Sequence, residues 1–117
     1  MYRLCSLDDI ADGAARGFDP CQSGADTVLA VRRGRQVHVY LNRCPHNDSR
    51  MEYMRHRFLS HDGRQIMCYA HGARFDIGSG VCTDGPCKGS SLTGIPARVQ
   101  QGDVLIARRH LRCLASQ

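Results

Sequence analysis

The chain has 117 residues, of which 42% are hydrophobic and 23% are charged, and its formal net charge is +5. This length suits one modest core, so we expect a single domain over residues 1–117. The 16 Lys and Arg residues are dispersed along the chain, which indicates an ordinary solvated surface rather than a nucleic-acid interface.

The cellular location is predicted from the N-terminus and from the cysteines. Residues 1–9 lack the apolar core of a signal peptide, and no apolar run approaches the roughly 20 residues that cross a bilayer. We therefore expect a cytoplasmic protein that does not bind a membrane. Cysteines in that compartment are mostly reduced, so we interpret Cys5, Cys21 and Cys113 as buried or incidental thiols.

The first half of the chain is predicted to form β-strands. Residues 2–6 form a candidate strand, and residues 14–18 form a segment that pairs back after a polar turn. Residues 27–32 and 36–42 are rich in β-branched and apolar side chains and are separated by a Gly-containing turn. This pattern predicts a hairpin that leads to Cys44.

A second hairpin is predicted after a polar, irregular stretch. Residues 57–61 and 64–68 flank an Asp-Gly pair, which favours a tight turn. We interpret His56 and His61 as exposed, and His38 as a structural or surface histidine within a strand.

The remaining segments also predict strands. Residues 73–76 form a strand, residues 81–89 form a loop with Gly and Pro, and residues 94–99 and 103–108 form a closing hairpin. No helical periodicity of useful length is present, so the predicted fold class is all-β.

Two short loops carry potential metal ligands. Cys44-Pro45-His46 and Cys68-Tyr69-Ala70-His71-Gly72 each supply a thiolate and an imidazole, and twenty-one residues separate them. Such pairs supply four ligands to one zinc ion, or two ligands to each iron of a [2Fe–2S] cluster. Two Cys and two His residues on Pro- and Gly-containing loops are poor material for a hydrophobic core.

The pattern C-x-H … C-x-x-H-G resembles the Rieske iron–sulfur family, and the resemblance covers nearly the whole chain. The segments that carry it are Asn42–His46, Cys68–Asp76, the Gly80 turn and the loop Gly85-Pro86-Cys87. The resemblance implies antiparallel sheets in a sandwich or partial barrel, with two cluster-binding loops at one tip.

The resemblance also implies the residues of the site. Cys44 and Cys68 would bind one iron of a single [2Fe–2S] cluster, and His46 and His71 would bind the outer iron near the surface. The residues expected around the ligands are Gly72, Ala73, Phe75, Gly85 and Pro86.

The implied function is electron transport rather than catalysis. A small ferredoxin of this family would carry one electron between a ferredoxin reductase and a terminal oxidoreductase, such as a ring-hydroxylating oxygenase. The chain has no room for a further mononuclear iron domain and no Gly-rich nucleotide motif, so enzymatic activity would reside in its partners. The alternatives are a small subunit resembling that of nitrite reductase and a zinc-stabilised binding module.

The residues near the ligands predict a low reduction potential. High-potential members of the family have a disulfide between the ligand loops, and Ser49 and Ala70 occupy the corresponding positions here. Ala73 and Phe75 replace hydroxyl residues that donate hydrogen bonds to the cluster, so the reduced state is stabilised less. Cys82 and Cys87 flank the third loop. They either form a disulfide or pack as small apolar groups, and we interpret them as reduced thiols because of the expected compartment.

Overall fold

The computed structural model describes residues 1–45, 49–52 and 54–115. Ten strands lie in these ranges: β1 (Tyr2–Ser6), β2 (Ala15–Phe18), β3 (Val28–Arg33), β4 (Gln36–Leu41), β5 (Gln65–Cys68), β6 (Ala73–Asp76), β7 (Cys82–Asp84), β8 (Gly94–Ile95), β9 (Ala97–Gln100) and β10 (Asp103–Ile106). The helical elements are the short 3-10 helix Leu7–Asp9 and α1 (Arg112–Ala115). No helix in the described part of the chain is long and apolar enough to cross a membrane.

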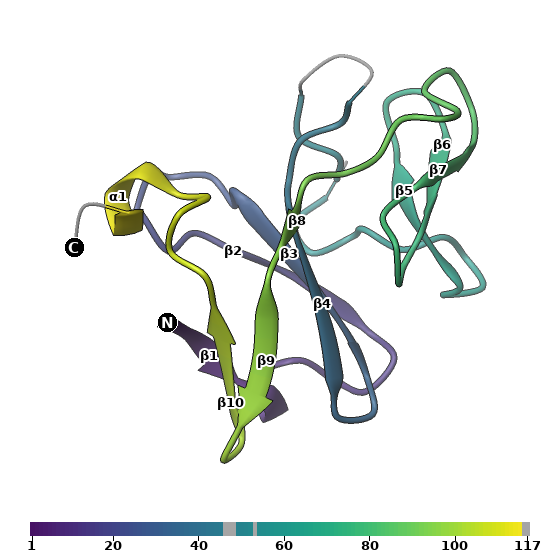
Figure 1. The fold of residues 1–117 in the computed structure, drawn as a ribbon. Helices are drawn as coiled ribbons and strands as arrows, with labels where there is room; N and C mark the ends of the chain where they lie inside the picture. Colours follow the sequence, from purple (N-terminus) through teal and green to yellow (C-terminus); the bar gives the residue numbers. More distant parts are fainter. Residues whose placement is uncertain (46–48, 53, 116–117) are drawn as a thin grey trace.

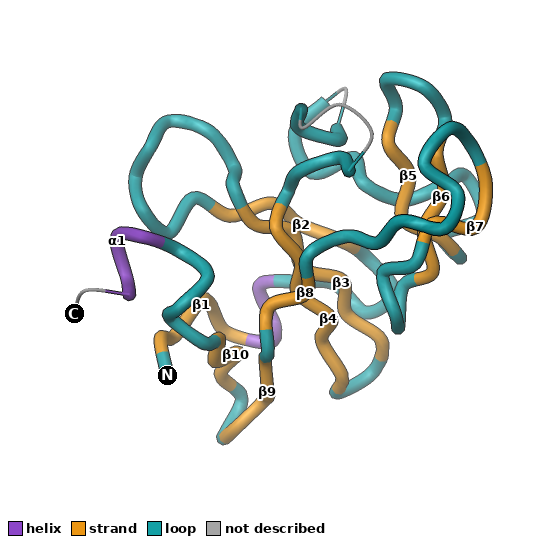
Figure 2. Tube along the Cα trace, turned by 45° about the horizontal axis from the view of Figure 1, so that its top comes forward, coloured by secondary structure: helices purple, strands orange, loops and turns teal. Residues whose placement is uncertain are grey.

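The strands form three antiparallel sheets, which confirms the all-β prediction. Their orders are β1-β10-β9, β2-β3-β4-β8 and β5-β6-β7. In both Figure 1 and Figure 2 the β2-β3-β4-β8 sheet lies in the middle, with the β5-β6-β7 sheet at one end of the molecule and the β1-β10-β9 sheet at the other.

Strand β3 is buried on both faces, because the sheet to which it belongs separates two hydrophobic clusters. Leu29 and Val31 point into a cluster shared with the β5-β6-β7 sheet, which we call the upper core. Val28 and Ala30 point into a cluster shared with the β1-β10-β9 sheet, which we call the lower core. A strand buried on both faces requires a continuous apolar run, and residues 28–31 supply one.

The predicted hairpin over residues 27–42 is confirmed as β3 and β4, which pair from Val28 opposite Leu41 to Arg33 opposite Gln36. Strand β2 pairs with β3 rather than back onto the first strand. Strand β1 instead pairs with β10, almost a hundred residues later in the chain.

The predicted closing hairpin is divided at Pro96. Strand β8 before it pairs with β4 in the middle sheet, whereas β9 after it pairs with β10. Proline has no N–H group to donate to a neighbouring strand, so the ladder is interrupted there and the chain passes from one sheet to another. The Pro96 carbonyl still accepts the N–H of Ala107 at 2.9 Å.

The predicted hairpin around Asp62-Gly63 is shorter than expected. Only Gln65–Cys68 forms a strand, and the segment before the turn contributes one isolated bridge, between Leu59 and Ile66. The predicted third loop, conversely, begins with the short strand β7.

The interpretation of Cys21 and Cys113 as thiols is wrong, because they form a disulfide with a Cα–Cα distance of 5.7 Å. Leu111 and Leu114 are buried in the lower core and hold α1 against the body. This packing brings Cys113 to the loop that follows β2. The pair is 92 residues apart in sequence, so no local pattern indicates it.

Candidate metal centre

The first predicted ligand loop leaves the end of β4 and turns back on itself. The N–H of Cys44 donates to the Ser49 carbonyl at 2.8 Å, so the loop is closed immediately around the cysteine. Cys44 is 1% exposed, and its side chain lies in the upper core. The thiol therefore faces the interior while Pro45 is exposed.

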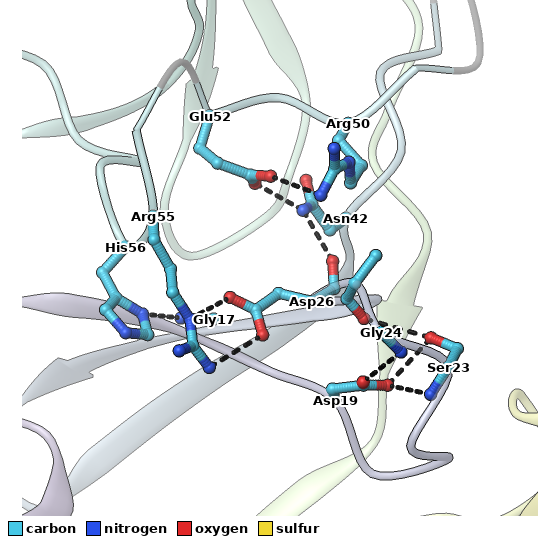
Figure 3. Close-up of polar contacts among 11 residues, drawn as sticks. Gly17, Asp19, Ser23, Gly24, Asp26, Asn42, Arg50, Glu52, Arg55 and His56 are labelled. Atoms are coloured by element: carbon cyan, nitrogen blue, oxygen red, sulfur yellow. Dashed lines mark hydrogen bonds and ion pairs between the residues drawn. The ribbon is translucent and has the colours of Figure 1, made fainter.

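Asn42 fixes the base of this loop through all of its side-chain polar groups, and Figure 3 shows the two bonds that its amide donates. Its amide nitrogen donates to the Asp26 carbonyl at 2.9 Å and to the Glu52 carboxylate, and its Oδ1 accepts the N–H of Met51 at 2.9 Å. Asn42 is itself buried. The two ends of the loop, at residues 42 and 51–52, are thus joined by one side chain.

A second group of polar residues braces the chain beside the loop. The guanidinium of Arg55 pairs with the buried Asp26 carboxylate at 3.1 Å, and Arg50 lies 3.9 Å from Glu52. His56 is partly buried, which corrects its predicted exposure, and its Nδ1 accepts the N–H of Gly17 at 3.0 Å (Figure 3).

The second predicted ligand loop is the turn between β5 and β6. Cys68 and Ala73 face each other at the end of the ladder, and the Gly72 N–H donates to the Cys68 carbonyl at 2.8 Å. Gly72 has a φ of +73°, a conformation that glycine adopts without strain. The side chain of His71 is exposed on this turn.

The two loops are bonded directly to each other. The Tyr69 N–H donates to the carbonyl of Met51, at the end of the first loop, at 3.0 Å. Cys44 and Cys68 share a side-chain hydrogen bond. Burial, and to a smaller extent this hydrogen bond, raises the pKa of Cys68. The backbone N–H groups of Ala70 and His71 also donate to the Cys68 sulfur. These two bonds lower the pKa of Cys68, because they stabilise its thiolate.

The predicted third loop packs on the second. A Cβ on Gly85 would come within 2.8 Å of the Ala73 Cα, so only glycine allows this approach. Ala73 and Phe75 are fully buried, whereas Pro86 is exposed. Cys82 and Cys87 are free and buried, as predicted.

The structure thus brings together two of the predicted ligands, Cys44 and Cys68, and places His71 on the adjoining turn. His46 lies outside the described residues. In the ranges that the structure describes, no three His, Cys, Asp or Glu side chains are placed to hold a metal ion. The bonds from Asn42 to Met51 and Glu52 were not predicted from the sequence, although a polar Asn at the end of an apolar strand was an available indication.

Comparisons with known proteins agree with the fold. The sequence profile of the Rieske [2Fe-2S] domain family matches residues 1–113. The comparison with curated proteins gave no match.

Three solved structures are similar to the chain. The ferredoxin of carbazole 1,9a-dioxygenase from Nocardioides aromaticivorans IC177 is 27% identical, with a TM-score of 0.69 over 90% of this chain and 94% of that one. A complex of reduced oxygenase and oxidized ferredoxin in carbazole 1,9a-dioxygenase contains a chain that is 25% identical, with a TM-score of 0.69 over 90% of each chain. The terminal oxygenase from Novosphingobium sp. KA1 shares the fold at 19% identity and a TM-score of 0.73, and this chain covers 28% of it.

Proposed function

Because the chain belongs to the Rieske [2Fe-2S] domain family, we propose that it is a ferredoxin that delivers single electrons to a ring-hydroxylating oxygenase. The observation that carries the proposal is the extent of the similarity. The chain spans nearly all of a stand-alone ferredoxin of a dioxygenase system, but only about a quarter of a terminal oxygenase. The zinc-stabilised module expected as an alternative has no support from these comparisons.

The proposed ligands are Cys44, His46, Cys68 and His71. The described residues fit a cluster, because two buried thiols lie side by side and two backbone N–H groups point at the Cys68 sulfur. Thiolates are the usual iron ligands in such clusters, and N–H donors stabilise negative charge on sulfur. When bound, the cluster accepts and releases one electron.

The residues of the site perform two tasks in this proposal. The upper core excludes water from the sulfur atoms of Cys44 and Cys68. His71, in contrast, is exposed at the surface of its turn, where a partner protein can approach. Electrons would therefore leave the protein on the side of the ligand loops.

The potential is proposed to lie toward the lower end of the Rieske range of roughly −150 to +300 mV. Ala73 and Phe75 have no hydroxyl groups, and both are fully buried beside the second loop. Fewer hydrogen bonds to the cluster make reduction less favourable. The proposed electron acceptor is the oxygenase, by analogy with the carbazole 1,9a-dioxygenase complex. The proposed electron donor is a ferredoxin reductase, as the family resemblance implies.

The proposal also places the protein in the cytoplasm. One observation points the other way, because the disulfide between Cys21 and Cys113 is of a kind that is rare in cytosolic proteins. Cell fractionation, followed by alkylation of free thiols under denaturing conditions, tests the location and the state of this pair together.

The proposed function is tested in the protein purified without oxygen. We expect iron and acid-labile sulfide in equal amounts and, after reduction with dithionite, a Rieske-type paramagnetic resonance signal. His71→Ala should abolish that signal, whereas His61→Ala, at an exposed histidine in the turn before β5, should preserve it.

The second step of the test measures electron delivery. The reduced protein is mixed with a ring-hydroxylating oxygenase in a stopped-flow instrument, and reoxidation is followed optically. Zinc without sulfide in the purified protein would overturn the cluster assignment. An intact cluster that no oxygenase reoxidises would overturn only the choice of partner.

A further inference from the structure

Two cysteines that the proposed electron transfer does not use lie together under the third loop. Cys82 begins β7, and Cys87 follows five residues later. The Cys87 thiol donates to the Cys82 sulfur at 3.0 Å, and both thiols are free. A covalent disulfide is about 2.05 Å long, so the two sulfur atoms need to approach by only about 1 Å to bond.

The backbone around this pair holds the two thiols in place. The Cys82 N–H donates to the Ser90 carbonyl at 2.8 Å, and the Ser90 N–H donates to the Cys87 carbonyl at 2.8 Å. The Lys88 N–H donates to the Gly85 carbonyl at 3.2 Å and closes a turn that contains Cys87. Both cysteines are thereby tied to the same residue, Ser90, so a disulfide would form without reorganising the loop.

The pair also lies against the metal centre. Cys82 and Cys87 belong to the same upper core as Cys44 and Cys68. Gly85, between them in sequence, touches the backbone of Ala73 next to the second ligand loop. A bond across the third loop would therefore fasten a segment that packs on the ligand loops.

Access to the pair is through Cys87. This residue is 6% exposed, but its neighbours Pro86 and Lys88 are exposed, so a small opening of the loop uncovers its sulfur. Burial has the larger effect and the hydrogen bond that Cys87 donates to Cys82 the smaller one, and together they raise the pKa of Cys87 to about 12. Reaction through the thiolate is consequently slow while the loop is closed.

We propose that Cys82 and Cys87 form a reversible disulfide by exchange with a small-molecule disulfide such as oxidised glutathione. Cys87 first attacks the glutathione disulfide, forms a mixed disulfide and releases one glutathione. Cys82 then attacks the Cys87 sulfur, forms the intramolecular bond and releases the second glutathione. The two cysteines lose two electrons and two protons, and these are recovered in two molecules of reduced glutathione.

The expected consequence is retention of the cluster. The new bond restricts opening of the third loop over the ligand loops, so iron escapes more slowly to a chelator. This inference goes beyond electron transfer. Its test measures thiols and iron, so its outcome does not depend on which redox partner the protein has.

The first measurement maps the bonds. The holoprotein is incubated without oxygen in glutathione buffers of increasing oxidised fraction, quenched in acid, alkylated and digested. We expect a peptide with Cys82 bonded to Cys87, at a mass about 2 Da below the dithiol form, while the visible spectrum of the cluster persists. Dithiothreitol should restore both thiols. Two alkylated thiols in every buffer, or a mixed disulfide that never closes, would overturn the proposal.

The second measurement follows iron loss to a chelator. In the oxidised protein we expect iron to be lost about fivefold more slowly, which is a small change relative to the total stability of a domain. Cys87→Ser should remove the dependence on glutathione, and Cys5→Ser, a free buried cysteine in the lower core, should keep it. Equal rates in oxidised and reduced wild-type protein would overturn the role in cluster retention.

Discussion

The role of Asn42 at the base of the first ligand loop leads to a quantitative prediction. Asn42→Ala removes two donated hydrogen bonds and one accepted bond at a site that is 6% exposed. Neutral hydrogen bonds contribute about 1 kcal/mol each, and a bond to a carboxylate contributes about 1.5–3 kcal/mol. The sum is roughly 3.5–5 kcal/mol, and relaxation with entry of water reduces it, so we expect a loss of about 3 kcal/mol.

Asn42→Asp tests the direction of these bonds. The carboxylate retains an acceptor for the Met51 N–H, but it has no donor for Glu52, whose side chain is only 8% exposed. Two carboxylates then face each other at low exposure, so this variant should be at least as unstable as Asn42→Ala at neutral pH.

Urea unfolding of the purified variants measures both effects, and iron content reports the state of the site. Gln36→Ala is the matched control, because Gln36 is an exposed side chain at the start of the same strand. Its stability should stay within about 0.5 kcal/mol of wild type. The assignment of Asn42 is refuted if Asn42→Ala loses less than about 1 kcal/mol and retains full iron content.

Three further predictions address other parts of the molecule. Cys21→Ser should lower the free energy of unfolding by about 4 kcal/mol without reductant, because it releases a loop of 92 residues, and dithiothreitol should abolish the difference in thermal melts. Burial, followed by the charge of Arg55, lowers the pKa of His56. As the pH falls, the unfolded state therefore binds a proton on this histidine before the folded state does. The stability of the wild-type protein should fall as the pH drops below about 6.5 and on through the lower pKa of the folded state. Urea midpoints measured between pH 8 and pH 5 should depend less on pH in His56→Asn than in the wild type. Gly85→Ala should destabilise the protein more than Gly89→Ala. Both glycines have positive φ angles, but only the Cβ added at position 85 would collide with a backbone atom. Chemical denaturation and iron analysis of the two variants measure the difference.

The features predicted correctly from sequence are those encoded by neighbouring residues. The β3–β4 hairpin follows from two apolar runs around one turn, and β6 follows directly from the Gly-containing turn before it. Resemblance of the loops around Cys44 and Cys68 to a family predicted the family correctly, because residue type and order carry that information without any geometry.

The features that were missed depend on contacts between distant segments. The disulfide joins residues 21 and 113, and the bond from Gly17 to His56 joins segments 39 residues apart. The division at Pro96 has a local cause, but the partners of β8 and β9 are set by the sheets on either side. Periodicity reports which residues are buried, and it does not report what they are buried against.

The arrangement of the three loops explains why the third is a suitable place to adjust the centre. The first and second loops contain the proposed ligands and are joined by the bond from Tyr69 to Met51, so a change in either loop disturbs the other. The third loop contains none of the four proposed ligands, yet Gly85 touches Ala73 and its cysteines share the core of Cys44. A bond between Cys82 and Cys87 would therefore change how firmly the site is covered while leaving every proposed ligand in place.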